Sequence, residues 1–139
     1  MASLSMKTTL AASADAAWAV VRDFGGVRKF IASLAKCQVE GSGVGATRTV
    51  AFEGGGDIVE RLESLDDPKR TLSYTILEGD LPFTGYLSTL MVRDLGKGRC
   101  ELTWSCTFEP AGATEAEVRQ IVAGVYSEGF AGLKSLLEG

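Results

Sequence analysis

The sequence contains no histidine, and this absence excludes more chemistry than any other feature of its composition. Without imidazole there is no Ser-His or Cys-His nucleophile, no histidine acid–base catalysis and none of the common zinc sites. Any catalysis must therefore use carboxylate, tyrosine, lysine, arginine or cysteine side chains. We expect neither a metal ion nor any other cofactor.

Cysteine is scarce as well, with three residues and no C-x-x-C spacing. Cys100 and Cys106 would lie on one face of the same strand, roughly 20 Å apart at about 3.3 Å per residue. This separation is too large for a disulfide. We therefore expect reduced, packed thiols.

Long apolar runs and basic clusters are also missing. No apolar run approaches the roughly 18 to 20 residues that span a bilayer, and Met1 to Leu10 lacks a signal-peptide core. The net charge is −4 and the 14 Lys and Arg residues are scattered, which disfavours nucleic-acid binding. We expect a cytoplasmic monomer or homodimer, without a membrane span, whose residues 1–139 form a single domain.

The longest predicted element is a helix from Thr114 to Glu138. Thr114 and Glu117 match a T-x-x-E capping box, which fixes its start. Apolar residues three or four positions apart define one face: Val118, Ile121, Val122, Val125, Leu133, Leu136 and Leu137. The helix also contains Gly124, Gly129 and Gly132. Each glycine costs about 1 kcal/mol relative to alanine, so either a sheet approaches closely there or space is left for another molecule.

The preceding residues alternate between short apolar segments and turns. We expect a first strand at Ser3 to Leu10, a short helix at Ala14 to Arg22, and a second short helix at Val27 to Leu34 after a break at Gly25-Gly26. Strands begin from Lys36 onward. The clearest are Thr47 to Glu53, Asp57 to Leu65, Arg70 to Glu78, Gly85 to Asp94 and Arg99 to Glu109. This order predicts an α+β fold in which a meander of hairpins packs against the last helix.

Alternation along each strand predicts which side chains face the core. The inward rows are Cys100, Leu102, Trp104, Cys106 and Phe108; Leu72, Tyr74 and Ile76; Tyr86, Ser88, Leu90 and Val92; Arg48, Val50 and Phe52; and Ile58, Glu60, Leu62 and Ser64. Arg48 and Glu60 thus occur where apolar residues are expected. A buried charge must be paired, shifted in pKa or exposed to a wet cavity.

Two interpretations of these charges stay open. In the first, Arg48 and Glu60 face a ligand cavity together with tyrosine and serine hydroxyls and bulky apolar groups. In the second, they form a simple salt bridge near the end of the sheet, and the aromatic residues are core. Two interpretations also stay open for the Gly54-Gly55-Gly56 turn: a flap over a cavity mouth, or a plain hairpin turn.

The order of one strand, two short helices, six strands and a long helix resembles the helix-grip superfamily of START domains, polyketide cyclases and Bet v 1-like pollen allergens. Short motifs look like its polyketide cyclase/dehydrase-like branch, which includes abscisic acid receptors and lachrymatory factor synthases. They are Gly45-Ala46-Thr47-Arg48, Val59-Glu60-Arg61-Leu62, Asp66-Asp67, Leu72-Ser73-Tyr74, Gly79-Asp80-Leu81-Pro82 and Tyr86. The resemblance covers about Ser3 to Leu137. It implies a curved antiparallel seven-stranded sheet wrapped around the C-terminal helix, in the order β-α-α-β6-α.

The resemblance also implies roles for single residues. Arg28, close to Phe30, falls where receptor relatives use a lysine to anchor a carboxylate. The loop that contains Leu81 is similar in position to their latch, without its histidine and arginine. Arg48 and Glu60 look like the arginine and glutamate that synthase relatives use on successive strands.

We therefore expect binding of a small, mainly hydrophobic ligand between the sheet and the last helix. The candidate ligand-binding residues are Arg28, Phe30, Val50, Phe52, Glu60, Tyr74, Ile76, Leu81, Tyr86, Ser88, Trp104, Ile121, Val125 and Gly129. The alternative is a cofactor-independent cyclase, dehydratase or isomerase acting on a polyketide-like or related carbonyl compound, with Glu60 and Arg48 as catalytic residues. A third class, an interaction protein that uses the outer sheet face, is supported only by Leu87 and Met91.

Overall fold

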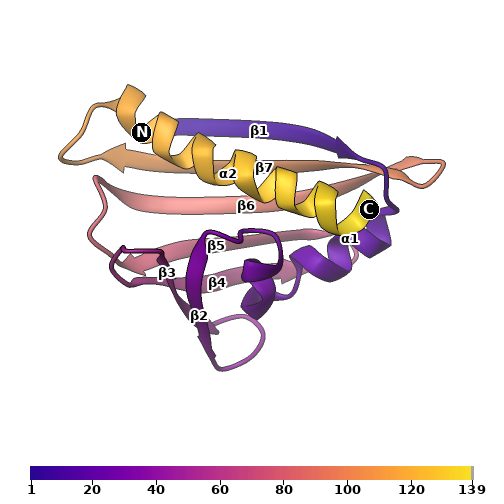
Figure 1. The fold of residues 1–139 in the computed structure, drawn as a ribbon, viewed down its shortest axis with the longest axis horizontal. Helices are drawn as coiled ribbons and strands as arrows, with labels where there is room; N and C mark the ends of the chain where they lie inside the picture. Colours follow the sequence, from indigo (N-terminus) through magenta and orange to yellow (C-terminus); the bar gives the residue numbers. More distant parts are fainter. Residues whose placement is uncertain (139) are drawn as a thin grey trace.

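A computed structural model describes residues 1–138, which form a curved antiparallel sheet of seven strands with a long helix across one face (Figure 1). The strands are β1 (Ala2–Leu10), β2 (Leu34–Glu40), β3 (Thr47–Phe52), β4 (Ile58–Asp66), β5 (Thr71–Glu78), β6 (Phe83–Gly96) and β7 (Arg99–Pro110). They are ordered β1-β7-β6-β5-β4-β3-β2. The helices are α1 (Ala14–Val21), the 3-10 helix η1 (Phe24–Lys29) and α2 (Glu115–Glu138). This confirms the predicted α+β helix-grip fold.

The predicted boundaries of the second short helix are wrong. The segment at Val27 to Leu34 is not a continuous helix, because η1 ends at Lys29 and Leu34 already pairs with Phe52 of β3. Gly25 does not break a helix either. It lies within η1, where a Cβ atom would come 2.8 Å from Cγ2 of Val39 on β2. Packing against β2 and β3 therefore decides the structure here, not local helix propensity.

The predicted inward rows are largely confirmed. All five even-numbered residues of β7 from Cys100 to Phe108 are buried, and Leu87 and Met91 of β6 are exposed on the outer face. Ser64 is the exception. A register shift between Leu62 and Ser64 turns the Ser64 side chain outward, where its hydroxyl lies 2.5 Å from that of Ser73. The β-bulge therefore ends the inward row of β4 at Leu62.

Helix α2 begins as the sequence predicts. The Thr114 hydroxyl accepts a hydrogen bond from the Glu117 backbone N–H at 3.2 Å, and Glu117 Oε1 accepts one from the Thr114 N–H at 3.1 Å. The buried face comprises Val118, Val122, Tyr126, Gly129, Phe130 and Leu133. Ile121 and Leu136 are about half exposed, so the predicted apolar face is only partly buried at these two positions.

The three glycines of α2 have different surroundings. A Cβ atom at Gly132 would overlap the carbonyl oxygen of Phe30, and one at Gly129 would come 2.6 Å from Cζ3 of Trp104. At Gly124 nothing lies within 4 Å. Close approach therefore explains two of the glycines, while the third is next to open space.

A second contact fixes α2 to the segment between η1 and β2. Glu128 accepts hydrogen bonds from the Ser33 N–H at 2.9 Å and from the Ser33 hydroxyl at 2.6 Å. Ser33 lies next to Leu34 at the start of β2. The C-terminal half of α2 thus holds this connecting segment in place.

Helix α1 is held to the β4–β5 turn by Asp67. Its carboxylate accepts hydrogen bonds from Trp18 Nε1 and from Arg22 Nε, both at 2.8 Å. The hydrogen bond from Arg22, and then that from Trp18, hold the pKa of Asp67 below its usual range.

Within residues 1–138 no helix is both long and apolar enough to cross a membrane.

Candidate ligand-binding cavity

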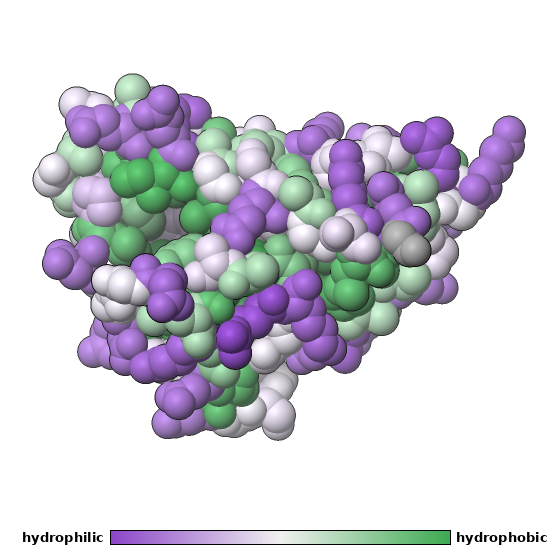
Figure 2. All heavy atoms as spheres, in the orientation of Figure 1, coloured by the Kyte–Doolittle hydropathy of each residue, from purple (hydrophilic) through white to green (hydrophobic). Residues whose placement is uncertain are grey.

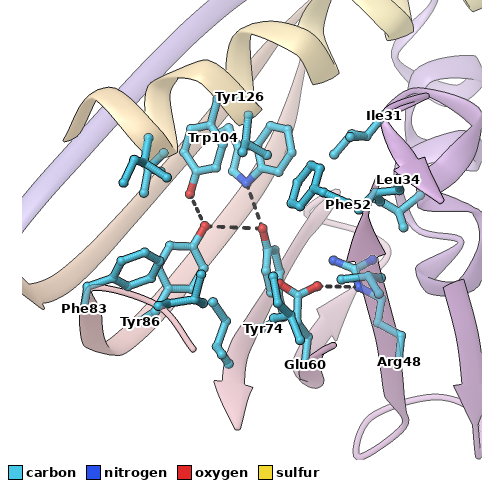
Figure 3. Close-up of a pocket in the computed structure, with 18 residues that line it drawn as sticks. Ile31, Leu34, Arg48, Phe52, Glu60, Tyr74, Phe83, Tyr86, Trp104 and Tyr126 are labelled. Carbon is cyan, nitrogen blue, oxygen red and sulfur yellow. Dashed lines mark hydrogen bonds and ion pairs between the residues drawn. The ribbon is translucent and has the colours of Figure 1, made fainter. Parts of the chain in front are cut away.

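A cavity of about 100 Å³ lies between the sheet and α2 (Figure 3). Figure 2 shows hydrophobic atoms around a hollow below the first half of α2. The lining residues come from every layer of the fold: Val27, Ile31, Leu34, Arg48, Val50, Phe52, Ile58, Glu60, Tyr74, Ile76, Leu81, Phe83, Tyr86, Trp104, Ile121, Val122, Val125 and Tyr126. Since a single water needs about 10 to 15 Å³ measured in this way, the space accommodates several waters or a small organic group.

Arg48 and Glu60 face this cavity from directly opposite positions on β3 and β4. Arg48 Nε donates to Glu60 Oε1 at 2.7 Å, and the two side chains are only 8% and 12% exposed. The two interpretations of these charges are therefore compatible. They form a buried salt bridge, and that salt bridge is part of the cavity wall.

The Arg48 guanidinium is fixed on three sides. Nη1 donates to the Phe24 carbonyl oxygen at 2.8 Å. Its Cζ atom lies 3.9 Å from the centre of the Phe24 ring and 5.0 Å from that of Tyr74, both within cation–π range. Such preorganised packing stabilises a buried charge that an apolar wall alone would not tolerate.

The ion pair does not use all the hydrogen-bonding atoms of its two side chains. Among the described residues, the side chain of Glu60 accepts one hydrogen bond, through Oε1, and Arg48 donates from Nε and Nη1. No fully buried side-chain nitrogen or oxygen within residues 1–138 lacks a partner. Glu60 Oε2 and Arg48 Nη2 are therefore in contact with open space and available to another molecule.

A second polar group, formed by the chain's three tyrosines, Ser88 and Trp104, lies toward α2. Tyr86 Oη lies 2.6 Å from Tyr126 Oη and 3.5 Å from Tyr74 Oη (Figure 3). Tyr126 Oη also lies 2.9 Å from Ser88 Oγ. Trp104 Nε1 donates to Ser88 Oγ at 3.0 Å and more weakly to Tyr74 Oη at 3.3 Å. We call these five residues the tyrosine network.

The direction of the hydrogen bonds in the tyrosine network follows from Ser88. Its only hydroxyl hydrogen is donated to the Ser105 carbonyl oxygen at 3.1 Å, so it accepts from Tyr126. Tyr126 must then accept from Tyr86, and Tyr86 from Tyr74. The Tyr74 hydrogen, facing a 3.5 Å contact, is the most weakly held of the three.

Burial sets the charge state of the tyrosine network. Desolvation raises the pKa of Tyr74, and it raises that of Tyr86 and Tyr126 far above the usual value of a phenol. The proximity of other tyrosines adds to the upward shift for Tyr86 and Tyr126. The network is therefore uncharged at any physiological pH.

Four candidate ligand-binding residues do not line the cavity. Arg28 instead donates to the Leu34 carbonyl oxygen at 3.0 Å, and Phe30 is buried beside Gly132. Ser88 is fully buried within the tyrosine network, and Gly129 packs against Trp104. These residues support the wall from behind. The other ten candidates, and Arg48, line the cavity.

Tyr126, the residue through which α2 joins the tyrosine network, is not among the residues predicted from the sequence. A signal was present, because Tyr126 falls four positions after Val122 and eight after Val118, on the same helical face. Phe83 of β6 also lines the cavity without having been predicted, as do Ile31 and Leu34 from the segment predicted to be a helix. The Gly54-Gly55-Gly56 turn contributes no lining residue, and the Gly55 N–H donates to the Phe52 carbonyl oxygen at 2.9 Å.

Several known proteins share this architecture. An uncharacterised protein from Bacillus thuringiensis is 26% identical, with 99% of this chain and 100% of that chain covered and a TM-score of 0.91. Protein XoxI from Bacillus cereus is also 26% identical, with 99% and 96% covered and a TM-score of 0.91. Norcoclaurine synthase from Thalictrum flavum, in complex with dopamine and hydroxybenzaldehyde, is 22% identical, with 97% and 85% covered and a TM-score of 0.79.

The sequence itself matches a family model over residues 1–138. That family is described as polyketide cyclase / dehydrase and lipid transport. The match covers every element that lines the cavity, from η1 to α2. The chain therefore belongs to the polyketide cyclase / dehydrase and lipid transport family.

Proposed function

We propose that this protein binds a small, mainly hydrophobic molecule in the cavity between the sheet and α2. The observation that carries the proposal is the composition of the wall. Apolar and aromatic side chains make up most of it, and two polar groups, the Arg48–Glu60 pair and the tyrosine network, face into it. A pocket of this kind selects ligands by shape and orients them through a few polar contacts.

The cavity also has a route to solvent. Ile121 lines it and yet is 46% exposed, so the space reaches the surface beside the first half of α2. A ligand with an apolar body and one polar end would place that end at the ion pair or at the tyrosine network. The small volume favours a compact ligand, or one whose remainder extends past Ile121.

Native mass spectrometry of the purified protein tests the proposal by detecting a small molecule that co-purifies with it. A cavity-filling variant makes the test specific. Val125→Phe places a bulky aromatic ring at a lining position of α2. Leu136→Phe introduces the same ring on the same helix, away from the cavity. The first variant should lose the bound mass and the second should keep it. Equal occupancy in both variants would contradict binding in this cavity.

A second candidate function is proton transfer without a cofactor, in a cyclisation, dehydration or isomerisation of a carbonyl compound. It is favoured by Glu60 Oε2, which accepts no hydrogen bond among the described residues and belongs to a carboxylate paired with Arg48 in the cavity wall. Glu60 would remove a proton from the carbon beside the carbonyl while Arg48 donates a hydrogen bond to the resulting enolate oxygen, and Glu60 would return the proton at another atom. Glu60→Gln should then abolish turnover while the variant still binds uncharged ligands. Full activity in that variant would rule out this reaction.

A further inference from the structure

In the salt bridge of the cavity wall the two charges neutralise each other, but some hydrogen-bonding atoms of the two side chains have no partner. Arg48 and Glu60 are the only charged side chains among the described residues that line the cavity, and their charges cancel. Glu60 Oε2 offers an acceptor and Arg48 Nη2 offers a donor. The site therefore presents a neighbouring donor and acceptor with no net charge.

A carboxylate fits such a wall poorly. Its attraction to Arg48 is opposed by repulsion from Glu60, since the two groups are in contact at 2.7 Å and any ligand atom near one is near the other. A carboxylate also loses its hydration on entering the cavity, and the weakened attraction to Arg48 does not offset this cost. A carboxylate would bind well only if it displaced Glu60 from Arg48.

We propose that the cavity selects uncharged ligands whose polar end carries a donor beside an acceptor, such as a primary carboxamide, and that it disfavours carboxylates. The amide N–H donates to Glu60 Oε2, and the carbonyl oxygen accepts from Arg48 Nη2. The body of the ligand packs among the aromatic rings of Tyr74, Phe52 and Trp104. This inference rests on the proposed ligand binding and names the chemical class of the ligand.

Matched probe pairs test it. Benzamide with benzoate, and a naphthamide with the corresponding naphthoate, differ in charge at almost constant shape, and isothermal titration at neutral pH measures their affinities. The wild-type protein should bind each amide about tenfold or more tightly than its acid, as one hydrogen bond to a charged group would give. In Glu60→Gln the preference should reverse, because Arg48 then has no anionic partner.

Glu63→Gln is the matched control. It removes one negative charge from the same strand, but Glu63 contacts Arg61 and Thr75 and does not line the cavity. It should leave the preference for amides unchanged, and a reversal there too would overturn the assignment to the ion pair. Tighter binding of the acids by the wild type would overturn the inference and keep ligand binding. Binding of no probe would overturn both, and the wild-type comparison decides even if Glu60→Gln does not fold.

Discussion

Gly132 of α2 lies directly against the backbone carbonyl of Phe30, with no room for even a methyl group between them. Alanine at this position must push the helix away from the segment between η1 and β2. We expect Gly132→Ala to lower the free energy of unfolding by about 2 kcal/mol, as overpacking a core does. Urea denaturation followed by circular dichroism measures this change.

Gly124 provides the control on the same helix, because nothing lies within 4 Å of its missing side chain. Gly124→Ala should raise the free energy of unfolding by about 0.5 to 1 kcal/mol through helix propensity. If both substitutions shifted stability in the same direction, the close approach at Gly132 would not be the reason for its glycine.

Ser88→Ala should weaken the fold through the tyrosine network. The serine hydroxyl accepts from Trp104 and Tyr126, and both donors would be left buried without this partner. We expect a loss of about 1 to 3 kcal/mol, typical of an unsatisfied buried group. Ser64→Ala, which removes a hydroxyl from the exposed outer face, should change stability by about 0.5 kcal/mol or less. Similar losses in the two variants would contradict the role of Ser88.

All three tyrosines of the chain belong to the tyrosine network, and burial raises the pKa of each. Ultraviolet absorbance should therefore show no tyrosinate in the native protein at about pH 10, where the urea-unfolded chain titrates. Since the folded pKa values lie above the unfolded ones, the stability from these groups is complete below about pH 10 and is lost as the pH rises further. Tyrosine ionisation in the folded state near pH 10 would contradict this assignment.

Asp67 gives the opposite pH dependence. Its pKa is lowered in the folded state by Arg22 and Trp18, so its contribution is present above the unfolded value of about 4 and is lost as the pH falls through the folded pKa. Asp67→Asn should be less stable than the wild type at neutral pH, and the difference should shrink below about pH 4. Urea titrations across this range provide the measurement, with Asp80→Asn in the exposed β5–β6 loop as the control. A difference independent of pH would contradict the proposed role of the Asp67 charge.

Much of the site could be predicted from strand alternation. The parity of β3 and β4 placed Arg48 and Glu60 inside, and that of β7 placed Trp104 inside, because each strand has one buried face. Alternation failed at Ser64, where one extra residue in β4 shifts the register. A bulge depends on pairing with the neighbouring strand, which a single strand's sequence does not record.

The conformation of the segment from Phe30 to Leu34 could not be predicted from its own sequence. Its apolar spacing is typical of a helix, yet it contacts Gly132, Glu128 and β3, and these tertiary contacts determine its path. Ile31 and Leu34 reach the cavity for the same reason. The hydroxyl geometry of the tyrosine network likewise depends on three strands and α2 meeting at one place.

The unequal anchoring of α2 has a kinetic consequence. Glu128, Gly129 and Gly132 make close contacts in its second half, whereas in its first half Gly124 and Ile121 lie beside open space although Val118 and Val122 are buried. Ligand exchange should begin with local fraying of residues 115–125. In hydrogen–deuterium exchange, the amide hydrogens of residues 115–125 should then be replaced by deuterium sooner than those of residues 128–133. An occupied cavity should slow that replacement in the first half and leave the second half unchanged.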